Sequence, residues 1–141
     1  MCDKYDKQHK LLPPVGDPKR YTVLQWVHAS EATYALHGLA VLYCRQIQNG
    51  GDVAKTEEAL SVNVQKDLDY LDSELEKSKG LFLLGDEVTA ADTMMELTVD
   101  FVFARQLGTQ GKKWARLEKY VKDCQATETW QRAQKKTGYR L

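Results

Sequence analysis

The chain has 141 residues, of which 43% are hydrophobic and 28% charged, and its formal net charge is zero. This composition indicates one globular domain with its own core and argues against a disordered chain. No apolar run reaches the roughly 20 residues of a membrane helix, and the polar residues 1–10 are unlike a signal peptide. Cys2, Cys44 and Cys124 are odd in number and widely spaced, which predicts reduced thiols and a cytoplasmic protein.

Charge is unevenly distributed along the chain. Residues 52–100 carry 13 acidic and 4 basic side chains, whereas residues 112–141 carry 9 basic and 3 acidic ones. A basic segment can attract nucleic acid. Between 112 and 122, however, the basic residues are interleaved with the apolar positions of a helix, which is typical of a solvated helix face. We therefore expect no nucleic-acid partner.

The first predicted helix begins after a segment, residues 1–16, that shows no sustained periodicity and ends in Pro13-Pro14-Val15-Gly16. Asp17 followed by Pro18 predicts a helix start, with Asp as the N-cap and Pro at the first helical position. The helix should run to the stop at Asn49-Gly50-Gly51. Apolar residues occupy two of its faces, which predicts two neighbours.

A second helix is predicted over residues 53–78, because Leu60, Val64, Leu68, Leu71 and Leu75 form a single apolar stripe. Gly80 is the expected end of this helix. The apolar residues 81–84 that follow are expected to be a short extended segment that packs toward the next helix.

The central helix of the domain is predicted to begin at Thr89. Thr89 and Asp92 form a capping box, in which each side chain satisfies the backbone N–H of the other residue. The helix that follows is so rich in apolar residues that we expect it to be buried. Thr93 lies opposite Val88 and gives only a weak hydrophobic staple. Gly108 is the predicted end of the helix.

Two shorter helices complete the predicted bundle. After a loop at 109–111, a fourth helix is marked by Trp114, Leu117, Val121 and Cys124. Thr127 or Thr129 then starts a last helix that should end at Gly138. The sequence shows neither a strand pattern nor an internal repeat, so the predicted fold class is all-α.

A search for catalytic motifs returns little. The sequence has no metalloprotease motif, nucleophile elbow or phosphate-binding loop. His28 and His37 lie on different faces of one helix, so they cannot jointly hold a metal. Glu31 can pair with His28 on one face. We assign no catalytic residue and no metal site.

Several motifs resemble the all-helical C-terminal domain of cytosolic glutathione S-transferases. They are Gly85-Asp86-x-x-Thr89-Ala90-Ala91-Asp92, the preceding Tyr70-Leu71-Asp72-x-x-Leu75, Trp26-Val27-His28-x-x-Glu31 and Trp130-Gln131-Arg132-Ala133. The last two resemble yeast-type and related bacterial members. The resemblance implies a helical domain at 17–141. It also implies that residues 1–16 are the end of an N-terminal thioredoxin-like domain and its linker, most of that domain being missing.

The resemblance also implies a function. In this family the N-terminal domain activates glutathione, and the first helix of the C-terminal domain forms the opposite wall of the cleft, where an apolar electrophile binds. Conjugation of glutathione to the electrophile serves detoxification. Trp26, His28, Ser30 and Tyr34 would face that cleft, with Tyr139 at its rim. Glutathione would be a co-substrate, and no cofactor is expected. Because none of these residues can generate a thiolate, we expect no turnover from this chain alone.

Two alternatives stay open. Isolated domains of this type serve as non-catalytic docking modules in translation elongation and aminoacyl-tRNA synthetase complexes. A domain without its thioredoxin-like partner can also expose apolar surface and form a homodimer.

Overall fold

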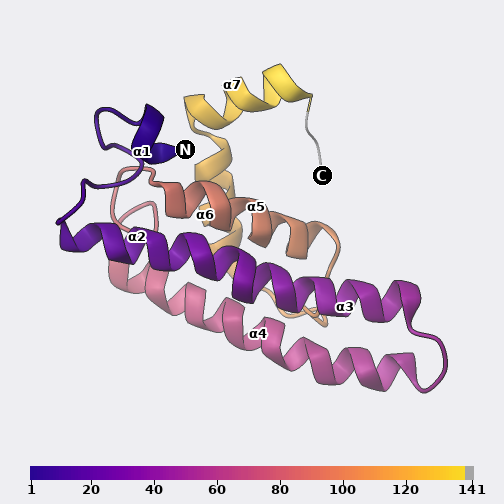
Figure 1. The fold of residues 1–141 in the computed structure, drawn as a ribbon. Helices are drawn as coiled ribbons and strands as arrows, with labels where there is room; N and C mark the ends of the chain where they lie inside the picture. The colour runs from indigo at the N-terminus through magenta and orange to yellow at the C-terminus, as the bar shows by residue number, and fades with distance from the viewer. Residues whose placement is uncertain (139–141) are drawn as a thin grey trace.

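The computed structural model describes residues 1–138, and this part of the chain is a bundle of helices without a strand (Figure 1). In chain order the elements are α1 (Cys2–Tyr5), α2 (Pro18–Ala29), the π-helix η1 (Ser30–Ala35), α3 (Leu36–Ile47), α4 (Val53–Ser78), α5 (Ala90–Ala104), α6 (Ala115–Gln125) and α7 (Glu128–Thr137). The predicted all-α class is confirmed.

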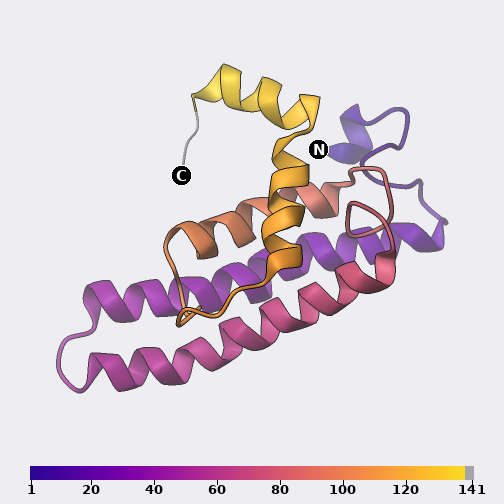
Figure 2. The ribbon, with the colours of Figure 1, turned by 180° about the vertical axis from the view of Figure 1, so that it is seen from behind.

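A long helical hairpin forms one layer of the molecule. The elements α2, η1 and α3 follow one another without a break, and α4 returns alongside them (Figures 1 and 2). Both arms begin as the sequence predicts: Asp17 accepts a hydrogen bond from the Lys19 N–H at 2.8 Å, and Asp52 accepts one from the Lys55 N–H at 3.1 Å. The π-helical turn in the middle of the first arm was not predicted.

Helix α5 lies against the first arm of the hairpin and is the inner helix of the bundle. It contacts α2, η1 and α6. Its residues Ala91, Met95 and Val99 are fully buried. Polar residues are sparse on this helix because it has neighbours on several sides. The predicted burial of the central helix is therefore confirmed.

Two predictions for this part of the chain were wrong, the end of the central helix and the conformation of residues 81–84. Helix α5 ends at Ala104 rather than Gly108, because Gln106 takes the left-handed conformation and the Leu107 N–H donates to the Val102 carbonyl at 2.9 Å. Helix α4 ends at Ser78, as predicted, although the left-handed residue that follows it is Lys79 rather than Gly80. The predicted extended segment 81–84 is a tight turn closed by a backbone bridge between Phe82 and Gly85.

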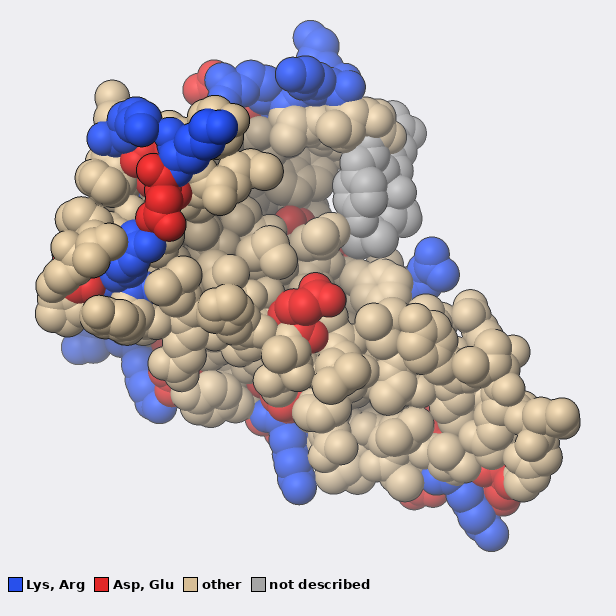
Figure 3. Space-filling model, in the orientation of Figure 1, with Lys and Arg blue, Asp and Glu red and all other residues tan. Residues whose placement is uncertain are grey.

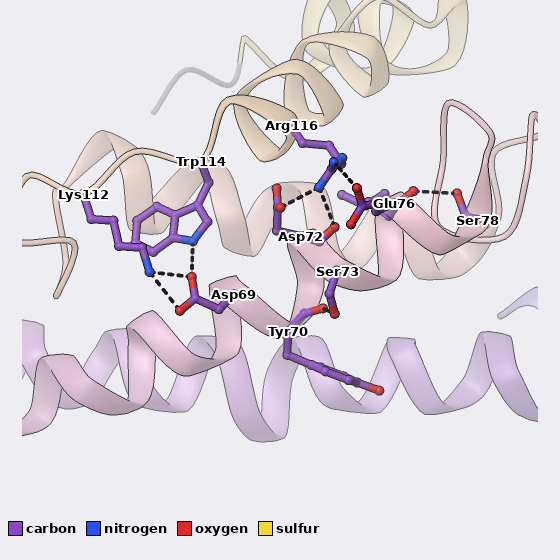
Figure 4. A network of polar contacts seen from close by, with 10 residues as sticks. Asp69, Tyr70, Asp72, Ser73, Glu76, Ser78, Lys112, Trp114 and Arg116 are labelled. Carbon is purple, nitrogen blue, oxygen red and sulfur yellow. Dashed lines mark hydrogen bonds and ion pairs between the residues drawn. The ribbon is translucent and has the colours of Figure 1, made fainter.

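Charged side chains join α4 to the segment that leads into α6 (Figure 4). Asp69 accepts hydrogen bonds from Lys112 at 2.6 Å and from the Trp114 indole N–H at 2.7 Å. Arg116 donates to Asp72 at 2.6 Å and to a second carboxylate on α4. Two of the basic residues assigned to a solvated face are thus paired with acidic α4, where they offset the excess negative charge.

The segment before α2 is held on the bundle by hydrogen bonds. The Asp6 carboxylate accepts from the backbone N–H groups of residues 10–12 at 2.7–3.0 Å. The Leu11 carbonyl then accepts from the Ala90 N–H at 2.8 Å, and Arg20 donates to the Pro13 carbonyl at 2.8 Å. This segment is packed on α2 and on the start of α5, while its assignment as an interdomain linker stays a prediction.

Candidate functional site

A buried carboxylate organises the start of α5. The predicted capping box is present, and Asp92 Oδ2 accepts from the Thr89 N–H and from the Thr89 hydroxyl, each at 2.8 Å. Asp92 Oδ1 accepts from the Leu83 N–H at 2.9 Å and from the Tyr120 hydroxyl at 3.1 Å. Asp92 therefore joins three segments, of which the sequence identified only the capped helix.

Trp26 and Tyr34, two of the predicted electrophile-site residues, lie together inside the domain. Their ring centroids are 6.4 Å apart, and Trp26 also stacks on Tyr70 of α4 with centroids 5.8 Å apart. Both predicted residues are buried. The Tyr34 hydroxyl has no hydrogen-bond partner among the described residues, and burial, with a contribution from Asp67, raises the pKa of this phenol.

Ser30 and His28 lie in different surroundings. Ser30 is fully buried, and its hydroxyl donates to the Val27 carbonyl at 2.8 Å. Its own carbonyl accepts from Thr98 of α5 at 3.4 Å, so Ser30 lies at the contact between η1 and α5. The His28 side chain is exposed on α2. Tyr139, the predicted rim residue, lies outside the described residues.

A cavity between α5 and α7 was not predicted. Its volume is about 290 Å³, and apolar side chains supply much of its lining, including Val88, Leu97 and Trp130. Figure 3 shows this face hollowed below α7, with mostly uncharged surface around the hollow and some acidic atoms within it. The cavity depends on how α7 folds back over α5, and a linear sequence carries no signal for that packing. The sequence came nearest to indicating this cavity in the weak Val88–Thr93 staple, because both residues line it.

The buried Cys124, which lines this cavity, is poorly suited to form a thiolate. Burial raises the pKa of the Cys124 thiol, and the nearby Asp92 carboxylate raises it further. Burial likewise raises the pKa of Tyr120. Within residues 1–138, the His, Cys, Asp and Glu side chains form no group that could hold a metal ion. The same residues include no helix that is long and apolar enough to cross a membrane.

The arrangement defines a class of protein: an all-α domain whose inner helix starts at a buried, multiply bonded carboxylate. A family model described as the glutathione S-transferase C-terminal domain matches residues 36–131. The chain belongs to this family. No curated protein matches the chain.

Solved structures of glutathione transferases share the fold. One from Methylococcus capsulatus has a TM-score of 0.78 and 23% identity, with 97% of this chain and 63% of that chain covered. One from Phanerochaete chrysosporium, in complex with oxidized glutathione, has a TM-score of 0.80 and 22% identity, with 96% and 61% covered. A homolog from Lodderomyces elongisporus has a TM-score of 0.78 and 18% identity, with 96% and 62% covered. This chain therefore spans less than two thirds of these relatives.

Proposed function

We propose that this chain supplies the helical wall of an electrophile site for glutathione conjugation and that it does not catalyse conjugation alone. The observation that carries the proposal is coverage: nearly all of this chain matches the transferases, and more than a third of each relative has no counterpart in it. We infer that the unmatched third includes the thioredoxin-like domain that activates glutathione.

The predicted wall residues divide by exposure. Trp26, Ser30 and Tyr34 are buried within this domain. In our proposal they fix the position of α2 and η1 by packing inside the domain, and they do not contact the electrophile. His28 is exposed and is the described residue of the set that can touch an electrophile directly. A π-helical turn next to this residue fits the proposal, because such turns often lie at functional sites.

The test compares the chain with a chimera. The chain alone should give negligible conjugation of glutathione to 1-chloro-2,4-dinitrobenzene, because our proposal assigns the group that lowers the pKa of the glutathione thiol to the thioredoxin-like domain. A chimera carrying the N-terminal region of the Methylococcus capsulatus transferase should conjugate. His28→Ala in the chimera should raise the KM for the electrophile with little change in the KM for glutathione.

Two results would contradict this proposal. One is turnover by the isolated chain that a single substitution within residues 20–40 abolishes. The other concerns two variants of the chimera, one with His28→Ala and one with a control substitution at the exposed Glu58 of α4. Equal KM values for the electrophile in these two variants would contradict the proposal. An inactive but folded chimera would remove the support for a shared catalytic architecture.

A non-catalytic interaction module is the second candidate function. It is favoured by the apolar side chains that α3 exposes, Leu36, Tyr43 and Ile47. In this case the partner is a protein, either the thioredoxin-like domain on a separate chain or a second copy. The module should show no retention on immobilised glutathione, and sedimentation should detect a defined assembly.

A further inference from the structure

The cavity between α5 and α7 combines an apolar body with acidic side chains. Three acidic residues line it, and because Asp92 already accepts four hydrogen bonds, Glu96 and Asp100 are the two carboxylates considered for a ligand. Leu97 and Trp130 also line the cavity, and a neighbouring cavity of about 300 Å³ shares both residues and extends along α7. Leu97 is 44% exposed although it lies on the otherwise buried helix α5. The apolar walls favour an organic ligand over a hydrated ion, since they cannot replace the water around an inorganic cation.

Glu96 and Asp100 supply the polar side of the cavity. They lie one turn apart on α5, and both contribute to its lining. Gln125 of α6 binds both through one amide group, with its Nε2 2.9 Å from Glu96 Oε1 and 3.2 Å from Asp100 Oδ2. One NH₂ group thus reaches both carboxylates, which places them close enough for a single cation to contact both.

The negative charge of this pair has no cationic partner within residues 1–138. The ion pairs among these residues do not involve Glu96 or Asp100, and no lysine or arginine lines the cavity. Glu96 is only 5% exposed, so water compensates its charge poorly. Burial accordingly raises the pKa of both carboxyl groups.

We propose that the cavity between α5 and α7 binds a small organic cation, with an ammonium group at Glu96 and Asp100 and an apolar body against Leu97 and Trp130. The cation supplies the positive charge that the two carboxylates lack within residues 1–138. The indole ring of Trp130 adds an aromatic face for the ligand body or for the cation itself. This site goes beyond the proposed function, because it requires neither glutathione nor a second domain.

Matched probes test the proposal on the full chain. The probes are 2-phenylethylamine, 2-phenylethanol and 3-phenylpropanoate, which share an aromatic body and differ in charge. Binding is read from the indole N–H signals in ¹H–¹⁵N spectra, with the Trp130 signal assigned from Trp130→Phe. The amine should move the Trp130 signal saturably and bind at least about tenfold more tightly than the alcohol, because charged hydrogen bonds are the stronger ones. The carboxylate should not bind.

Substitutions then separate charge from shape. Glu96→Gln and Asp100→Asn keep an oxygen that accepts from Gln125, and each should weaken amine binding about tenfold while leaving alcohol binding unchanged. Glu58→Gln, at an exposed site on α4, is the matched control and should leave amine binding intact. Circular dichroism checks that each variant is folded, and a second pair, Leu97→Ser and Leu81→Ser, compares the cavity with an exposed apolar site elsewhere.

Three outcomes would overturn the proposal. The first is equal binding of amine and alcohol, which would make the cavity an unselective apolar site. The second is no movement of the Trp130 signal at 20 mM amine, a concentration at which even a ligand with a Kd of about 1 mM would nearly saturate its site. The third is a dimer in sedimentation that Leu97→Ser disrupts, which would assign this face to a second copy. Each result is independent of conjugation assays, so the two proposals can fail separately.

Discussion

Tyr34 is a buried phenol whose hydroxyl lacks a partner among the described residues. A buried polar group without a hydrogen bond lowers stability because it has lost its contact with water. Tyr34→Phe should therefore raise the free energy of unfolding by about 1 kcal/mol, measured by urea denaturation. Tyr120→Phe is the matched control: its hydroxyl donates to Asp92, so the same change there should lower stability. Destabilisation by Tyr34→Phe would reveal a partner for this hydroxyl.

Glu96 should make the stability of the folded chain depend on pH, and the direction of this dependence follows from its pKa shift. Its pKa is raised in the folded protein, chiefly by burial, so the folded state holds this proton more tightly than the unfolded state. The stabilising contribution is complete below the ordinary pKa of a glutamate and is lost as the pH rises through the folded value. Glu96→Gln should thus stabilise the chain by about 1 kcal/mol at pH 7 and by less at pH 4. Melting curves at both pH values check this, and an equal effect at both would contradict it.

The start of α5 depends on more than its cap. Thr89→Ala removes part of the capping box and should cost about 1 kcal/mol. Asp92→Ala removes four hydrogen bonds and leaves the Tyr120 hydroxyl and the Leu83 N–H unsatisfied, so it should cost about 3 kcal/mol or more. Thermal denaturation of both variants checks the ranking, with Asp17→Ala at the exposed start of α2 as the control. Equal losses for Thr89→Ala and Asp92→Ala would mean that the long-range bonds contribute nothing.

Gly108 is required by packing rather than by the end of α5. Its φ is +66°, and a Cβ there would lie 3.0 Å from Val64 Cβ and 3.2 Å from Ser61 Cα on α4. Gly108→Ala should therefore cost about 2 kcal/mol or more. Gly111 also has a positive φ, of +79°, but its Cβ would meet nothing within 4 Å. Gly111→Ala should cost only the backbone strain of about 1 kcal/mol, and denaturation of the two variants measures the difference.

Local chemistry made the helix starts predictable. Asp17 and the Thr89–Asp92 pair act on backbone groups within three residues, so their pattern is visible in the sequence. Asp52 caps α4 in the same way, although α4 was predicted from its apolar stripe. The end of α5 was predicted less well, because Gln106 takes a left-handed conformation that usually indicates glycine. Lys79 does the same after α4, but that helix still ends at Ser78 as predicted. The π-helical turn acts like a one-residue insertion in the apolar pattern of the first arm. Because two apolar faces were already expected on this arm, the shift was not recognised.

The candidate sites were only partly predictable from the sequence, because they depend on contacts between distant segments. The four described wall residues were identified from one stretch of helix. The contacts that help to bury Trp26 and Ser30 come from Tyr70 and Thr98, which lie far away in sequence. The carboxylates of the α5–α7 cavity read as ordinary polar positions on a buried helix. The positions of Gln125 and of α7 show that these carboxylates share a cavity.

The outer face of α3 bears on the assembly of the whole molecule. Leu36, Tyr43 and Ile47 are 57%, 51% and 72% exposed, and their spacings of seven and four place them on one stripe. A stripe of this kind can pair with its own copy across a two-fold axis, since the same apolar surface is present on both partners. We therefore expect the isolated chain to self-associate through α3, with a sedimentation coefficient that rises with concentration.

Charge introduced on this stripe should prevent the association. Tyr43→Lys with Ile47→Lys should give a monomer at every concentration, because two like charges would face each other across the axis. The melting temperature of the dilute protein should be nearly unchanged, since both side chains are exposed. Val62→Lys alters a 48% exposed side chain on α4 and serves as the control that should keep the assembly. A wild-type chain that stays monomeric up to about 1 mM would contradict self-association through α3.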